Sequence, residues 1–394
     1  MKKSKFIFMI VCIAVIILAL ASSLTYHVTV QRLKAGEIYL QGQDYETLKE
    51  YFELDAVQDI ILTHYVEEIG ESDLVKGTLS GMVKGLGDHS SAFYTQEEYR
   101  NFEDTPEDSH IAEGMLLGYT EEATQLQVIR VFPDTPAYEA GIKAGDIILN
   151  IDNKDTKAMD IDIAIGYLRG ADGTTVTLNI MSGQEVFEIQ LTRKPPIVQL
   201  VYTDMLDEKV GYINIVEFSG TVVEDFTKAI EEMKNENAEY IIIDIRNVSG
   251  GAVKQMSQIA DTLLPAGEVT HTIAKSGENA KWESDDEVLW DKPVGILTGN
   301  QTADIAEVFA ASLQERGRAT ILGEKTLGRA VETTIYKIES SGNAVKLVTA
   351  RYYTPEGGLI DGLGVAPDVV IEGNVSPEVD EQLESAAEYM SAQS

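Results

Sequence analysis

Residues 240–253 read YIIIDIRNVSGGAV, an apolar run that passes through polar residues into two glycines. A continuous run of this kind, rich in β-branched side chains, is typical of a strand buried on both faces of a parallel sheet. The polar residues and glycines indicate a turn, and a helical pattern follows them. The segment therefore predicts a strand–turn–helix unit of an α/β fold.

The same alternation continues around this segment, from Pro195 onward. The further patterns are strands at 210–215, 294–297 and 319–322, and helices at about 222–235 and 304–315. Strands separated by helices favour a largely parallel central sheet. We expect a mixed α/β core over residues 195–373 and an acidic, helix-prone tail at 374–394.

Two regions of different character precede the core. Apolar residues recur at three- and four-residue steps between Leu48 and Tyr65, which predicts an amphipathic helix, and a second helical stretch is expected at about 72–85. We assign residues 25–107 to a linker and an N-terminal helical region. Residues 108–194 show short strand patterns separated by turn signals, which predict a small β-rich domain.

The charge of the chain is strongly acidic. It has 31 lysines and arginines against 65 aspartates and glutamates, a formal net charge of −34 among 394 residues. Such a field repels phosphate backbones, so nucleic acids are excluded as expected partners. Much of this charge is expected to lie on a solvated surface.

The first residues break this acidic pattern. Three lysines within residues 1–5 precede an uncharged apolar run at 6–24, whose 19 residues can cross a hydrocarbon core of about 30 Å as a helix. The lysines place the N-terminus in the cytoplasm and the bulk of the chain outside a bacterial-type plasma membrane. The alternative is a signal peptide that is cleaved near Ala19 to Ser22, which yields a secreted protein. Cys12 is the only cysteine, so a disulfide framework is excluded.

One motif points to a peptide-binding domain. Residues 136–152 read PAYEAGIKAGDIILNID, which resembles the PDZ domain of exported proteases. PDZ domains bind peptide C-termini by strand addition, with a loop of backbone N–H groups that meets the terminal carboxylate. The resemblance implies that this loop and its strand are formed by Gly114, Met115, Leu116, Leu117 and Gly118.

Further motifs extend the resemblance over about residues 51–370. GMVKGLGDHSSAFY at 81–94, IIDIRNVSGGAV at 242–253, GEKTLGRA at 323–330 and ARYYTPEGGLIDGLGVAPDVVI at 350–371 occur in one order. Together they are similar to the C-terminal processing (tail-specific) serine peptidase family with a PDZ domain. The resemblance implies cleavage of polypeptides by a Ser/Lys dyad with a supporting Gln.

The chain departs from the family at the residues of this dyad. Where the family has Ser-Ala-Ser-Ala-Ser-Glu, residues 302–307 read TADIAE, and we match the nucleophile to Ala306. Arg329 replaces the lysine base, and a guanidinium stays protonated because its pKa exceeds about 12. Thr333 replaces the supporting Gln. Gly250 and Gly251 remain where the family builds part of its oxyanion site.

Other residues at the start of this expected helix have structural interpretations. Thr302 and Asp304 are expected to cap the helix, and Asp304 with Glu307 resembles a capping box. Ser312 lies six residues beyond Ala306, which turns a helix by about 600°, so its side chain faces a direction about 120° away from that of Ala306. None of the five histidines belongs to a metal-binding spacing, so neither a metal nor an organic cofactor is expected.

These observations predict a pseudopeptidase that binds polypeptide C-termini or unfolded segments and regulates an active relative. A homodimer through the N-terminal helical region is the further expected partner. One alternative is an active serine or threonine endopeptidase with a relocated nucleophile. The other alternative is an envelope scaffold whose groove binds no peptide.

Overall fold

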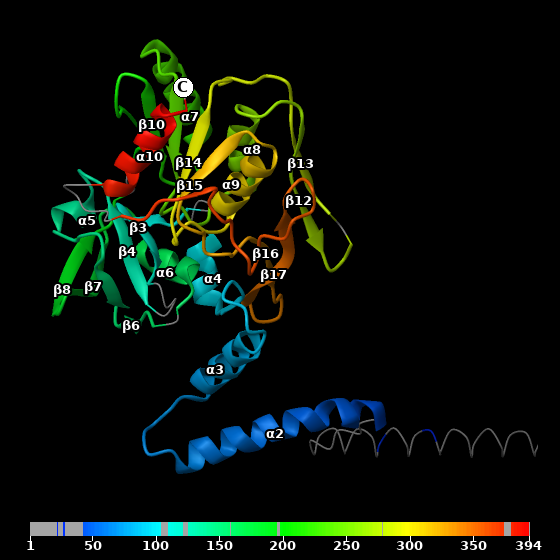
Figure 1. Ribbon diagram of the computed structural model, residues 1–394. Helices are drawn as coiled ribbons and strands as arrows, with labels where there is room; N and C mark the ends of the chain where they lie inside the picture. The colour runs from blue at the N-terminus through cyan, green and yellow to red at the C-terminus, as the bar shows by residue number, and fades with distance from the viewer. Residues whose placement is uncertain are drawn as a thin grey trace, which may run out of the picture. The chain divides into compact units, whose positions relative to one another are not determined.

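The computed structural model describes residues 42–103, 109–120, 125–157, 159–194, 198–277, 279–373 and 380–393, together with Ser22 and His27 (Figure 1). The chain divides into two compact units, residues 1–78 and 79–394. Apart from Ser22, the transmembrane segment expected at 6–24 lies outside the described residues. Among the helices that are described, none is long and apolar enough to cross a membrane.

The first unit is helical, as expected from its periodicity. Helix α2 covers Gly42–His64, and helix α3 (Glu71–Lys84) begins in this unit. Large apolar side chains along these residues are exposed to solvent, among them Tyr51, Phe52, Val57, Ile60, Tyr65 and Val66. Exposed apolar groups of this size commonly mark an interaction surface.

The second unit contains the expected central sheet. Its strand order is β18 (Val369–Val370), β15 (Ala319–Gly323), β14 (Val294–Thr298), β11 (Tyr240–Asp244), β10 (Val210–Ile215) and β9 (Val201–Met205). Every pairing from β18 to β10 is parallel, and only β9 runs antiparallel to its neighbour. The prediction of a largely parallel central sheet is confirmed for this sheet.

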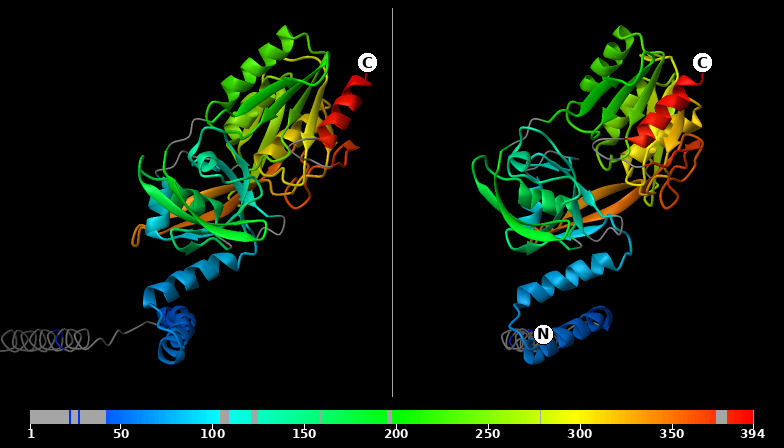
Figure 2. Two further views of the ribbon diagram at one scale, coloured as in Figure 1. Left: turned by 90° about the vertical axis from the view of Figure 1, so that its left-hand side faces the viewer. Right: turned by 60° about the vertical axis from the view of Figure 1, so that its left-hand side comes forward.

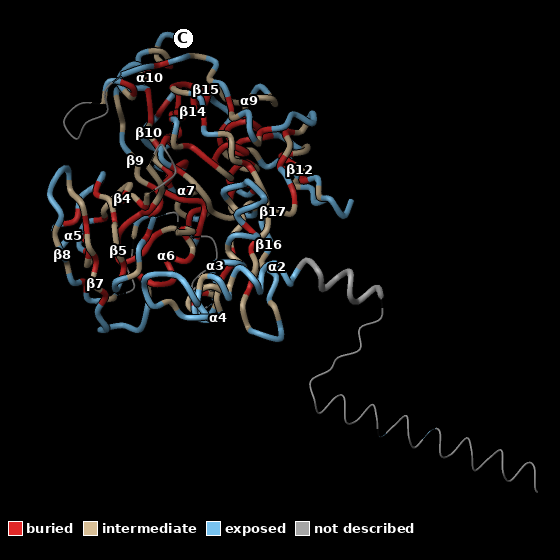
Figure 3. Tube along the Cα trace, turned by 90° about the horizontal axis from the view of Figure 1, so that it is seen from below, coloured by how far each residue is buried: buried red, intermediate tan, exposed pale blue. Residues whose placement is uncertain are grey.

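Helices cover both faces of the central sheet (Figure 2). Ile241 and Ile243 of β11 join the apolar cluster formed with helices α7 (Val222–Asn235), α8 (Val253–Asp261) and α9 (Ile305–Glu315). Ile242 points to the opposite face and packs with helix α10 (Glu381–Ser391). Because its side chains alternate between two covered faces, all of β11 is buried, and it is apolar up to Asp244. The neighbouring strand β14 is buried throughout as well (Figure 3). The helix-prone tail therefore forms part of the core.

The β-rich domain has its own sheet, and all its pairings are antiparallel. The order is β2 (Ile111–Ala112), β3 (Met115–Tyr119), β4 (Leu126–Val131), β5 (Ile147–Ile151), β7 (Thr175–Ser182) and β8 (Glu185–Thr192), with β6 (Lys154–Asp155) beside β5. Two helices, α5 (Pro136–Glu139) and α6 (Ile161–Leu168), complete it. Every residue of helix α6 except Asp162 is buried, so the helix packs in the core of this domain.

A third sheet was not expected from the sequence. It joins β1 (Ala92–Tyr94), β12 (Gly267–Ala274), β13 (Lys281–Ser284), β16 (Val331–Lys337) and β17 (Ala344–Tyr353) in antiparallel pairings. Among the strands that the structure describes, antiparallel pairings are thus more numerous than parallel ones. The expectation of a helical region up to residue 107 is wrong at β1, which pairs with β17, and is right again at helix α4 (Gln96–Glu103).

Candidate functional site

The start of helix α9 is strained. Asp304, the residue before the helix, has φ 54° and ψ −125°. A positive φ is rare for a residue other than glycine and is tolerated where the surroundings enforce it, often at functional sites. The side chain of Asp304 makes no capping hydrogen bond, so the expected capping box is wrong. Its carboxylate points toward residues from two other segments instead.

The Asp304 carboxylate accepts four hydrogen bonds from three residues. Its Oδ2 accepts hydrogen bonds from the Ser249 hydroxyl at 2.9 Å and the Gly250 N–H at 3.1 Å. Arg329 donates to the same carboxylate from Nε to Oδ1 at 3.1 Å and from Nη2 to Oδ2 at 3.0 Å. A two-point contact of this kind is the strong geometry for an arginine and a carboxylate.

Each partner of this ion pair holds the other in its charged form. Burial alone would raise the pKa of Asp304, but the charge and hydrogen bonds of Arg329 lower that pKa below its usual value. The charge of Asp304 raises the pKa of Arg329 against the effect of burial. Arg329 therefore stays protonated and cannot remove a proton from a nucleophile.

Glu307 fixes the backbone that carries Arg329. It is fully buried, and its carboxylate accepts hydrogen bonds from the Gly328 N–H at 2.6 Å and the Arg329 N–H at 2.7 Å. The Thr326 hydroxyl donates to the same carboxylate. Burial raises the pKa of Glu307, opposed by these hydrogen bonds. The sequence pattern pointed to helix capping, whereas the structure shows that Glu307 holds the loop at 326–329.

The residue that we matched to the nucleophile does not face this site. Ala306 has no exposed surface and lies in the apolar cluster under the central sheet. It follows Asp304 by two residues, which turns a helical side chain by about 200°. Thr333 lies on β16, where it is exposed and pairs with Val348. The structure thus brings together Asp304, Arg329 and the Gly250 segment.

The two glycines occupy positions that require their conformational freedom. Gly250 has φ 77° and Gly251 has φ 95°. A Cβ on Gly250 would lie 2.6 Å from the His110 ring, and a Cβ on Gly251 would lie 2.9 Å from the carbonyl oxygen of Phe218. The chain can therefore present the Gly250 N–H at the site only without a side chain. That donor is already used by Asp304.

The expected peptide-binding loop lies next to the same residues. Gly114 has φ 87° and no room for a Cβ, and Met115, Leu116 and Leu117 are buried in β3. Leu116, Leu117 and Gly118 line a cavity of about 60 Å³. Its remaining lining includes Ser249, Ala303 and Arg329 from the core. A small cavity therefore connects the β-rich domain with the Asp304–Arg329 pair.

Two alternative nucleophiles differ in their surroundings. Ser312 is fully buried, and its hydroxyl donates to the Val308 carbonyl at 2.6 Å, so it is unavailable to a substrate. Ser249 lies at the cavity, donates to Asp304 and accepts a hydrogen bond from Arg329 Nη2 at 3.0 Å.

Within the described part of the chain, no group of acidic, histidine or cysteine residues could hold a metal ion.

Comparison with known proteins gives a consistent result. Family models match residues 209–371 as Peptidase family S41, 127–180 as a PDZ domain and 18–98 as the Activating protease CtpB N-terminal domain. The "Carboxy-terminal processing protease CtpA" of Bacillus subtilis is 28% identical over 94% of this chain and 78% of its own length. The "Carboxyl-terminal-processing protease" of Synechocystis sp. is 30% identical over 74% of this chain and 69% of its own length.

A solved structure shows the same fold. The photosystem II D1 C-terminal processing protease has a TM-score of 0.62 and 22% identity, covering 85% of this chain and 90% of that one. This likeness is evidence for the fold alone. Family membership rests instead on the Synechocystis relative, which is 30% identical over 74% of this chain, and on the agreeing family matches: the chain belongs to the C-terminal processing proteases of Peptidase family S41.

Proposed function

We propose that this chain is a proteolytically inactive member of its family that binds polypeptide C-termini or unfolded segments outside the cytoplasm. The observation that carries this proposal is the Asp304 carboxylate, which accepts the Gly250 N–H and pairs with Arg329. An oxyanion site must leave its donors open for the developing charge of the substrate. Here the negatively charged Asp304 carboxylate of the protein itself occupies the donor that a substrate oxyanion would use.

The arrangement also revises the match to the family. Asp304 stands on a strained turn at the start of a helix and faces the residue in the position of the base. A catalytic nucleophile is typically presented on such a turn. We therefore place the nucleophile's position at Asp304, and Ala306 becomes a core residue. The loss of the nucleophile and of the base is then one coupled exchange of Ser and Lys for Asp and Arg.

This exchange replaces reactive groups by a stable ion pair. Serine–lysine chemistry requires a neutral amine that accepts the hydroxyl proton. Neither Arg329 nor a carboxylate held by Ser249, Gly250 and Arg329 supplies it. In the pair, each partly buried charge has its counter-ion, so neither is left uncompensated.

A second candidate function, an active endopeptidase, would use Ser249. Its hydroxyl donates to the Asp304 carboxylate at 2.9 Å, which is the geometry of a nucleophile and a general base. The depressed pKa of Asp304 disfavours this role, because an effective base has a pKa near the working pH. The Ser249→Ala variant tests this candidate.

The proposal predicts peptide binding without cleavage. Purified full-length protein in detergent should leave casein intact and should bind a fluorescein-labelled neutral decapeptide that ends in an apolar residue. Amidation of its C-terminus should weaken binding at least about tenfold, because the PDZ loop recognises the terminal carboxylate. Casein cleavage that Ser249→Ala abolishes would establish the second candidate. Failure to bind any peptide would favour the envelope scaffold.

The proposed homodimer uses the exposed apolar residues of α2, which are suited to cover one another in a second copy. Sedimentation velocity should give a dimer for the chain and a monomer for the Phe52→Glu/Ile60→Glu double variant. Equal sedimentation of the two proteins would contradict a dimer interface on this surface.

The membrane anchor at 6–24 and the regulation of an active relative stay predictions.

A further inference from the structure

Strand β17 has an interrupted edge. Along one edge it pairs with β16 from Ala344 to Arg351. The other edge pairs with β1 at 344–346 and with β12 at 350–353, so both of these strands share that edge. Residues 347–349 lie between them and have no strand partner there. We call this interruption, bounded by Ala92 of β1 and Ala274 of β12, the strand gap.

The strand gap is long enough for a short piece of extended chain. Four residue steps separate Lys346 from Ala350, which corresponds to about 13 Å along a strand. The Val348 N–H points into the gap and donates to the Ser91 hydroxyl at 3.1 Å. In an antiparallel strand the carbonyl of a residue faces the same edge as its N–H. The Val348 carbonyl is therefore presented to the gap without a neighbouring strand, as at a sheet edge, while the Val348 N–H is bound by Ser91.

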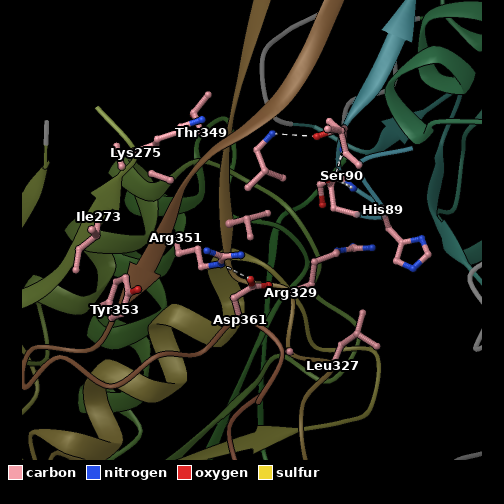
Figure 4. A pocket seen from close by; sticks show the side chains of 18 residues that line it. His89, Ser90, Ile273, Lys275, Leu327, Arg329, Thr349, Arg351, Tyr353 and Asp361 are labelled. Carbon is pink, nitrogen blue, oxygen red and sulfur yellow. Dashed lines mark hydrogen bonds and ion pairs between the residues drawn. The ribbon is translucent and has the colours of Figure 1, made fainter. Parts of the chain in front are cut away.

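A cavity of about 1060 Å³ opens at the strand gap (Figure 4). Its lining includes both rims of the gap, with Ser91 on one side and Lys275 on the other, and Val348 and Thr349 of β17 between them. Ile273 and Leu327 line it as well, and their side chains are available to a ligand because 45% and 49% of their surfaces are exposed. Apolar side chains at this exposure offer contacts to the side chains of a bound peptide.

Basic side chains line this cavity in an otherwise acidic protein. Arg351 and Asp361 pair at 2.8 Å, and Arg329 is occupied by Asp304. Asp88 also lines the cavity, and its exposed carboxylate accepts the Ser90 and Ser91 N–H groups through Oδ1. Among the described residues, no carboxylate lies within ion-pair distance of Lys275. Lys275 therefore leaves a positive charge at the rim of the strand gap.

We propose that the strand gap binds an internal, extended peptide segment that carries an acidic side chain, inserted antiparallel to β17 between β12 and β1. A backbone N–H of the segment donates to the Val348 carbonyl, and its acidic side chain lies at Lys275. This inference rests on the proposed peptide-binding function and adds a second site that needs no peptide terminus. It differs from the PDZ loop, which recognises a terminal carboxylate.

The test uses the full-length chain and a labelled twelve-residue peptide of alternating valine and glutamate with an amidated C-terminus. This probe has no terminal carboxylate for the PDZ loop. We expect it to bind and to slow amide hydrogen exchange over residues 345–351. The variant Lys275→Glu should weaken its binding at least about fivefold, and a matched valine–lysine peptide should prefer that variant.

The control variant is Lys254→Glu, which changes the same charge at an exposed residue outside the cavity lining. Equal affinities of the two variants, or no protection over 345–351, overturns the strand-gap proposal. Binding of only the free-carboxylate peptide, with protection confined to 114–118, overturns the strand gap and leaves the proposed function standing. If neither peptide binds, both proposals fail.

Discussion

The double variant Asp304→Ser/Arg329→Lys should cleave casein slowly, at a rate on the order of 10²-fold above that of the unmodified chain. Serine at 304 would stand on the strained turn beside the Gly250 N–H, which the carboxylate no longer blocks. A lysine at 329 can lose its proton when it is buried, and general-base assistance contributes about 10²- to 10⁴-fold. Adding Thr333→Gln should raise the rate further, because it supplies the family's supporting residue.

The matched control is Ala306→Ser/Arg329→Lys, which should remain silent. Ala306 is fully buried, so the hydroxyl of a serine at this position would be as inaccessible as that of Ser312. Release of casein peptides, measured by their free amines, checks both variants. If the Ala306 variant cleaves casein and the Asp304 variant does not, the nucleophile's position returns to Ala306.

Replacing Lys346 by methionine should destabilise the chain by about 3–5 kcal/mol, because it leaves buried carboxylates without their counter-ion. Lys346 of β17 pairs with Asp160 at 2.9 Å and Asp162 at 2.5 Å, at the start of helix α6, and all three are largely buried. The Tyr94 hydroxyl donates to the same carboxylates. This cluster joins the PDZ domain to the third sheet, so the variant should also become more sensitive to limited proteolysis between them.

The pH dependence distinguishes lost charge pairing from lost packing. Burial raises the pKa of Asp162, but Lys346 and His110 lower it below the unfolded value. The stability from this pair is therefore present above the unfolded pKa and is lost as the pH falls through the lower folded pKa. Without Lys346 the Asp162 carboxylate protonates at higher pH, because the charge that lowers its pKa is gone, and its repulsion with Asp160 is then relieved. Urea unfolding should show a smaller difference between variant and parent at pH 4 than at pH 7.

The exposed residue Lys337 of β16 provides the control, since Lys337→Met changes the same charge without a buried carboxylate. Its stability should stay within about 0.5 kcal/mol of the parent. A loss for Lys346→Met that is the same at pH 4 and pH 7 would assign its effect to packing alone.

Local patterns in the sequence determined much of this fold. The apolar run at 240–244 predicts a buried parallel strand, because it must present apolar side chains to both faces of the sheet. The turn glycines at 250 and 251, the β-rich domain and the permanently charged Arg329 also follow from residue chemistry in short segments. Each of these predictions depends only on the types and spacing of residues that are close in sequence, and a local sequence pattern records both.

Only the tertiary structure decided which residue occupies the site. The motif at 302–307 favoured Ala306, but a helical side chain turns by about 100° per residue, and the docking of α9 on the sheet selects the residue that faces Arg329. Asp304 is 25 residues from Arg329 and 54 residues from Gly250. The strand gap likewise depends on β1 and β12, which are far apart in sequence and share one edge of β17. Such contacts leave no local signal, because their energy arises only once the distant segments have packed.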